Sequence, residues 1–109
     1  MRESSTQRYL LHKLNQIPYS EWLKPTTTNK AGAQDVVGHI QGYHVAIEWK
    51  VPGNKPKALQ KYRIEQTVKK GACSFWADNW QDVEKNLKHF AKWRGFDLYS
   101  GPAPKLWML

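Results

Sequence analysis

The spacing of apolar residues changes along the chain, and each spacing predicts one kind of element. From Glu3 to about Gln16, apolar residues recur every three or four positions, which predicts an amphipathic helix that Pro18 ends. Residues 19–33 are rich in turn-forming side chains. We therefore expect a loop there, with a short strand near residues 21–24.

The residues that follow predict a β-hairpin. Two runs rich in β-branched residues, 34–40 and 43–51, are separated by Gln41 and Gly42, which suit a two-residue turn. Alternation along the second run separates an apolar face, directed toward the core, from a polar face. The apolar face holds Val45, Ile47, Trp49 and Val51, and the polar face holds His44, Ala46, Glu48 and Lys50.

The second half of the chain predicts a helix and then a strand. Pro56 suits the first turn of a helix over residues 57–70, and Gly71 caps the end of that helix. Residues 72–77 form a short apolar run, which predicts a buried strand.

A last helix has signals at both ends. Asp78 and Gln81 form a capping pair ahead of a helix that runs to about Trp93, and Gly95 stops it. The tail, residues 95–109, is apolar and interrupted by proline, which indicates no particular element. We treat residues 1–109 as one domain with a core of about residues 3–94.

Charge and cysteine content narrow the class of protein. Lys and Arg number 17 against 9 Asp and Glu, so the formal net charge is +8 and the pI is near 9.7, which favours a polyanionic partner such as nucleic acid. The single cysteine excludes an intramolecular disulfide, and no apolar run reaches the length of a membrane span or signal peptide. We expect a soluble cytoplasmic protein, in the host cytoplasm if the chain is viral. An ordinary basic globular domain is the alternative on composition alone.

The hairpin brings together residues suited to metal chemistry. If the turn has two residues, Ile40 faces Tyr43, and counting outward places Asp35 directly opposite Glu48. Two opposed carboxylates repel each other, and a divalent cation such as Mg²⁺ offsets that repulsion. Lys50, on the same face, adds a cation where negative charge develops during attack on a phosphodiester. A bulged or longer turn would break this pairing.

These residues also have simpler interpretations. An Asp near a strand start and a Glu-x-Lys within a strand are common on a solvated sheet face. We expect Gln60 on the helix side that packs toward the sheet, where its amide needs a partner, although a solvent-exposed glutamine is the alternative. His39 and His44 can be cross-strand neighbours but lack zinc-ligand spacing. Cys73 is expected in the core, without an activating context.

Four short runs form a recognisable pattern: Gly-Ala-Gln-Asp-Val-Val-Gly, Ala-Ile-Glu-Trp-Lys, Lys-Ala-Leu-Gln and Lys-Lys-Gly-Ala, at residues 32–38, 46–50, 57–60 and 69–72. Together they resemble the virus-type replication-repair nuclease (VRR-NUC) domain, a branch of the PD-(D/E)XK nuclease superfamily. The resemblance spans roughly residues 3–87. Glu3 and Gln7 match the family's Glu-x-x-x-Gln, whereas Gln34 stands where the family has Pro, which affects loop shape more than ligand identity.

The resemblance implies a fold, a reaction and a set of site residues. The fold is α/β, with a central mixed β-sheet flanked by helices. The reaction is Mg²⁺- or Mn²⁺-dependent hydrolysis of a DNA phosphodiester, leaving a 5′-phosphate. The implied residues are Asp35, Glu48 and the backbone carbonyl of Trp49 as metal ligands, Glu3 as a further acidic ligand, Lys50 to activate or orient the water, and Gln60 to support the site.

Size and family together suggest a substrate and an assembly. Small stand-alone members of the family resemble homodimers that act on branched DNA in DNA repair, such as four-way (Holliday) junctions. DNA contacts are expected from Lys30, Lys55, Lys57 and Lys61. A non-catalytic basic DNA-binding module is the alternative. A third interpretation is an interaction protein that uses the apolar end, residues 106–109, which is also a candidate dimer contact.

Overall fold

The computed structural model describes residues 3–25 and 36–108, without the side chains of residues 3–5. Helix, strand and hairpin follow one another as the apolar spacing predicts, and the short strand expected near residues 21–24 is present. The elements are α1 (Glu3–Leu14), β1 (Ser20–Leu23), β2 (Val36–Ile40), β3 (Tyr43–Trp49), α2 (Ala58–Lys69), β4 (Cys73–Ala77) and α3 (Trp80–Arg94).

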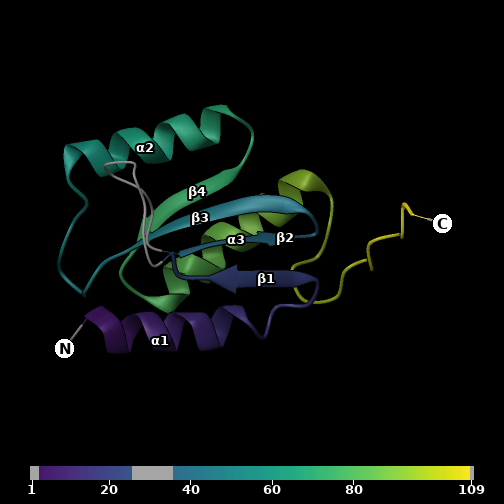
Figure 1. Cartoon of the computed structure of the whole chain (residues 1–109), viewed down its shortest axis with the longest axis horizontal. Helices are drawn as coiled ribbons and strands as arrows, with labels where there is room; N and C mark the ends of the chain where they lie inside the picture. The colour runs from purple at the N-terminus through teal and green to yellow at the C-terminus, as the bar shows by residue number, and fades with distance from the viewer. Residues whose placement is uncertain (1–2, 26–35, 109) are drawn as a thin grey trace.

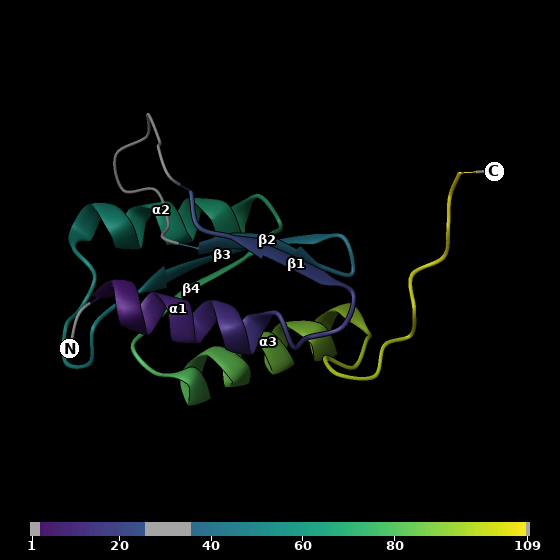
Figure 2. The same ribbon diagram turned by 60° about the horizontal axis from the view of Figure 1, so that its bottom comes forward.

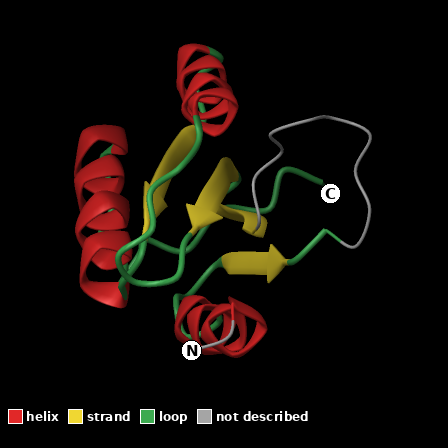
Figure 3. Ribbon diagram, turned by 90° about the vertical axis from the view of Figure 1, so that its left-hand side faces the viewer, coloured by secondary structure: helices red, strands yellow, loops and turns green. Residues whose placement is uncertain are grey.

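The strands form one mixed sheet between two layers of helices. The sheet order is β1-β2-β3-β4, with antiparallel pairs at β1-β2 and β2-β3 and a parallel pair at β3-β4. Helix α2 lies on one face, and α1 and α3 lie on the other (Figures 1 and 2). Figure 3 shows the same layers end on. This arrangement confirms the expected α/β fold. Within the described ranges no helix is long and apolar enough to cross a bilayer.

The hairpin between β2 and β3 has a two-residue turn. Gln41 and Gly42 both adopt positive φ, at 55° and 82°, which is the backbone of a type I′ turn and matches the twist of the strands. Ile40 therefore pairs with Tyr43, as predicted. A hydrogen bond from the Gln41 Nε2 to the Pro102 carbonyl, 2.5 Å long, ties the turn to the carboxyl-terminal segment.

The hydrophobic core lies between the sheet and the pair α1 and α3. Its inaccessible side chains come from all three elements: Leu10, Leu14, Val45, Ile47, Val83 and Leu87. By contrast, α2 contributes no buried residue. The two faces of the sheet are thus unequal, because one carries the apolar core and the other is covered by a polar helix.

Both later helices begin differently from the prediction. The residue that caps α3 is Asn79, whose side chain accepts from the Asp82 backbone N–H, so the pairing of Asp78 with Gln81 is wrong. Pro56 precedes the N-cap Lys57, so it lies outside the first turn of α2. The predicted helix ends are confirmed: Gly71 and Gly95 follow α2 and α3 with positive φ.

Gly38 lets the β1 and β2 strands approach closely. It pairs with Trp22, and a Cβ at Gly38 would lie 2.1 Å from the Glu21 carbonyl oxygen and 2.7 Å from the Trp22 ring. The indole therefore rests on a bare backbone that no larger residue can provide.

We expect Gly38→Ala to lower the free energy of unfolding by about 1–3 kcal/mol, because β1 and the buried indole must shift. Urea denaturation monitored by tryptophan fluorescence measures the change. His39→Ala, at the neighbouring exposed position, is the control and should stay within about 0.5 kcal/mol of the parent. Equal stability of the two variants would contradict the close approach.

Candidate active site

Glu48 is the most buried charged side chain that the described residues contain. It lies on β3, on the face covered by α2, and is 1% exposed. An ionised carboxylate removed from water costs several kcal/mol unless hydrogen bonds and a counter-charge offset the loss of hydration. The interpretation of this strand surface as a solvated face is therefore wrong at Glu48, because α2 covers that position.

Gln60 supplies the hydrogen bond that Glu48 needs. Its amide Nε2 donates to Glu48 Oε1 over 2.5 Å, and its Oε1 accepts from the Lys57 backbone N–H over 2.7 Å. The second bond satisfies a free donor at the start of α2, so one side chain both begins the helix and attaches it to the sheet. These partners also fix which end of the amide faces the carboxylate. The exposed alternative for Gln60 is wrong.

Lys50 supplies the counter-charge. Its Nζ lies 3.3 Å from Glu48 Oε1, and its side chain is only 18% exposed. Lys50 follows the last residue of β3, and its backbone N–H donates to the Ala77 carbonyl over 2.9 Å, which extends the contact with β4. Lysine and carboxylate therefore share one face of the sheet, as the alternation predicted.

Three predicted residues cannot be placed. Asp35 and Lys30 lie outside the described residues, and the side chain of Glu3 is not described although its backbone belongs to α1. The hairpin register is described as far as Val36 opposite Ile47, in agreement with the predicted counting. Asp35 opposite Glu48 thus stays a prediction.

The donor chemistry at Glu48 fits a hard divalent cation. Its carboxylate is an oxygen ligand of the type that Mg²⁺ takes, and Mg²⁺ sites commonly use one or two carboxylates and keep several waters. Among the described residues, no three His, Cys, Asp or Glu side chains gather as a metal-binding group. The side chains of Asp35 and Glu3, the other predicted acidic ligands, are not among those described.

Three of the four predicted DNA-contacting lysines are described, and they follow the candidate site in the chain. Lys55 belongs to the loop between β3 and α2, Lys57 caps α2, and Lys61 lies in its first turns; all three side chains are exposed. The loop after β3 and the start of α2 thus carry exposed positive charge. His39 and His44 pair across strands on the same face, as expected, and both are exposed.

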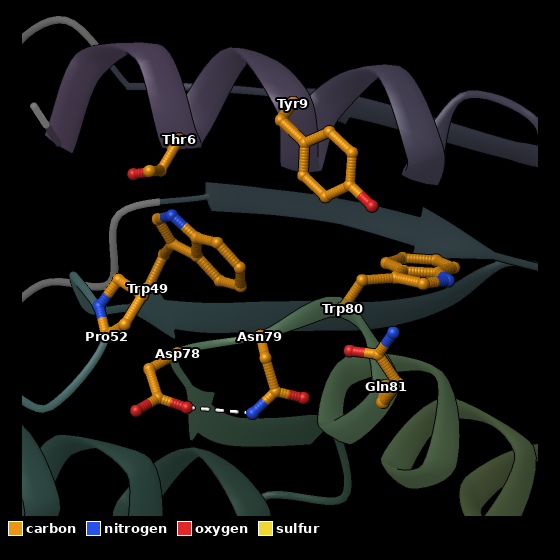
Figure 4. A pocket seen from close by; sticks show the side chains of 8 residues that line it. All are labelled: Thr6, Tyr9, Trp49, Pro52, Asp78, Asn79, Trp80 and Gln81. Atoms are coloured by element: carbon orange, nitrogen blue, oxygen red, sulfur yellow. Dashed lines mark hydrogen bonds between the residues drawn. The ribbon is translucent and has the colours of Figure 1, made fainter. Parts of the chain in front are cut away.

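A pocket on the opposite face was not predicted. It has a volume of about 480 Å³ and lies between α1, the end of β3 and the start of α3 (Figure 4). Tyr9, Trp49 and Trp80 form its aromatic walls, and Asp78 and Asn79 form its polar edge. Its aromatic residues are far apart in the sequence, and the pocket exists only where three separate elements meet.

Gln60→Glu tests the dual role of the amide. The new carboxylate still accepts from the Lys57 N–H, but it cannot donate to Glu48 and it places a second negative charge beside it. We expect the free energy of unfolding at pH 7 to fall by about 1–3 kcal/mol. Gln66→Glu on the same helix is the matched control. A Gln60→Glu variant as stable as that control would show that the bond to Glu48 does not hold α2.

Cys73 has the properties of a core residue, as predicted. Burial raises the pKa of its thiol to about 12. At pH 8 the native thiol should resist a disulfide reagent such as DTNB and react fully once guanidinium unfolds the chain. Because only the unfolded state releases the thiol proton above about pH 9, stability should decline as the pH rises past that value. Fast labelling of the native protein would contradict the burial.

The comparisons with known proteins agree with the fold. No protein-family model matches the sequence, and no curated protein matches it. Among solved structures, a VRR_NUC domain matches with a TM-score of 0.67 and 23% sequence identity, over 81% of this chain and 96% of that one. Its fold is the one that the four short runs implied. The chain therefore has the fold of a VRR_NUC domain.

Proposed function

We propose that this protein is a metal-dependent DNA endonuclease. The single observation that carries the proposal is the buried Glu48 carboxylate, held by Gln60 and paired with Lys50 on a VRR_NUC fold. Buried charges that are retained at a cost to stability are concentrated at functional sites. The net charge of +8 supports a nucleic-acid substrate.

Mg²⁺ or Mn²⁺ is the proposed cofactor. Glu48, Asp35 and the backbone carbonyl of Trp49 would hold the ion, with Glu3 as a further acidic ligand. When bound, such an ion lowers the pKa of a water molecule and stabilises negative charge on the phosphate oxygens. Glu48 is already held in position for this task by two partners.

Lys50 is the residue that we propose to orient or activate the attacking water. Its ammonium group lies beside the carboxylate, where it orients the nucleophile and stabilises the charge of the phosphate under attack. Gln60 acts on Glu48 and is a positioning residue. Hydrolysis by in-line attack at phosphorus releases the 3′ oxygen and leaves a 5′-phosphate.

Branched DNA, with four-way (Holliday) junctions as the first example, is the proposed substrate, and a role in DNA repair follows from it. A homodimer would present two sites to a symmetric junction. Lys30, Lys55, Lys57 and Lys61 are the proposed phosphate contacts; the exposed lysines of this group support binding that weakens steeply with salt.

The test is cleavage of a labelled four-way junction and a matched duplex with Mg²⁺ or Mn²⁺. Lys50→Ala should reduce the rate by about 100-fold or more, because it removes a group that acts on the water. Glu48→Gln should abolish cleavage and the calorimetric isotherm for the metal. The matched controls are Glu65→Gln and Lys69→Ala, and both variants should cleave at the rate of the parent protein. In the parent, the exposed Lys69 Nζ and Glu65 Oε1 of α2 lie 3.2 Å apart.

Two results would overturn the proposal. One is the absence of metal-dependent cleavage on either DNA. The other is tight DNA binding in EDTA that improves in Glu48→Gln without any cleavage by the parent protein, which would identify a non-catalytic DNA-binding module. Equal rates on junction and duplex would retain the nuclease and remove only the preference for branched DNA.

A further inference from the structure

The aromatic pocket on the face opposite Glu48 has no role in the proposed hydrolysis. We propose that it binds one unpaired nucleobase of the DNA beside the cleavage site. This inference rests on the proposed nuclease function for the identity of the ligand. The evidence is the aromatic lining of the pocket, the charge at its edge and its position relative to the candidate active site.

The walls of the pocket suit a flat aromatic ligand. Figure 4 shows the rings of Trp49 and Trp80 on either side of the opening, with Tyr9 of α1 above it. Trp49 and Trp80 are 2% and 8% exposed and add little accessible ring surface, whereas Tyr9 is 51% exposed and offers most of the aromatic surface that a base can stack on. A volume of about 480 Å³ is ample for a base and its sugar. Stacking of bases on aromatic rings is a sequence-tolerant source of affinity.

The edge of the pocket favours a base over a phosphate. Hydrogen bonds from Asn79 and the Gly53 backbone lower the pKa of Asp78, so its carboxylate is charged at neutral pH. The carboxylate of Asp82 lies next to it, 3.0 Å from Asn79 Nδ2. Only Asp78 of these two carboxylates lines the pocket, where its negative charge repels a phosphate but can accept a hydrogen bond from an N–H group of a base.

The pocket and the candidate active site are connected in the sequence. Both include residues at the end of β3, and the loop after β3 also contributes to the pocket. Trp49 stands between Glu48 and Lys50 in sequence, with its side chain on the other face of β3. The loop after Lys50 contributes Pro52 to the pocket wall, and the Asp78 carboxylate accepts from the Gly53 N–H over 3.2 Å. The end of β3 therefore carries candidate active-site residues on one face and an indole that lines the pocket on the other.

Lys13 adds a cation at the margin of the pocket. Its Nζ lies 5.4 Å from the centre of the Trp80 ring. Lys13 is not among the residues that line the pocket. We expect its ammonium group to contact a backbone phosphate next to the bound base.

The experiment compares binding to two duplexes in EDTA, where no cleavage occurs. One carries a single bulged adenine and the other an abasic bulge at the same place. The parent protein should bind the adenine bulge roughly 5- to 100-fold more tightly, as expected for stacking of one base. Tyr9→Ala should lose most of that preference, because Tyr9 offers most of the accessible aromatic surface of the pocket. Tyr62→Ala, an equally exposed tyrosine on α2, should keep it.

The outcomes are separate from those of the cleavage test. Equal binding of both duplexes by the parent protein, or an unchanged preference in Tyr9→Ala, overturns the base pocket even if cleavage is observed. Retention of the preference by a protein that does not cleave supports the pocket and rejects the nuclease. Equal binding of the two duplexes by the parent protein, together with a change of sedimentation behaviour in Tyr9→Ala, would show instead that a second copy of the chain fills the pocket.

Discussion

The buried charge of Glu48 is the constraint on which the α2 side of this molecule depends. A carboxylate that is 1% exposed must find polar partners inside the protein, and two different elements supply them. Gln60 reaches it from α2, and Lys50 reaches it from the end of β3. No residue of α2 is fully buried, and side chains such as Ile64 are only partly covered. The contact that stabilises the carboxylate is therefore also one of the interactions that attach α2 to the sheet.

The two faces of the sheet have different roles, because one carries the apolar core and the other carries the candidate active site. The face toward α1 and α3 carries the apolar core, which contains the inaccessible side chains of three elements and supplies the hydrophobic driving force. The other face can then carry charge, because the stability of the domain does not depend on apolar packing there. If the charged residues lay on the same face as the apolar core, positions needed for apolar packing would have to carry charge instead.

The loop after β3 links the two faces. Lys50 begins it on the side of the candidate active site, while Pro52 and Gly53 reach the aromatic pocket and Asp78. Asp78 thus holds this loop through the Gly53 N–H, and Asn79 caps α3 in its place. Neighbouring Asp and Asn residues are equally suited to an N-cap, so the sequence alone does not distinguish Asp78 from Asn79. The choice between them depends on a loop that lies 25 residues earlier in the chain.

The sequence by itself determined the elements, the hairpin register as far as it is described, and the shared face of Glu48 and Lys50. These are local properties: apolar periods, a two-residue turn and alternation along a strand act between neighbouring residues. Tertiary structure alone decided that Glu48 is buried, that Gln60 is its partner, and that Tyr9, Trp49 and Trp80 enclose a pocket. Burial and enclosure depend on which elements cover a face, and this is settled only when residues distant along the chain pack together.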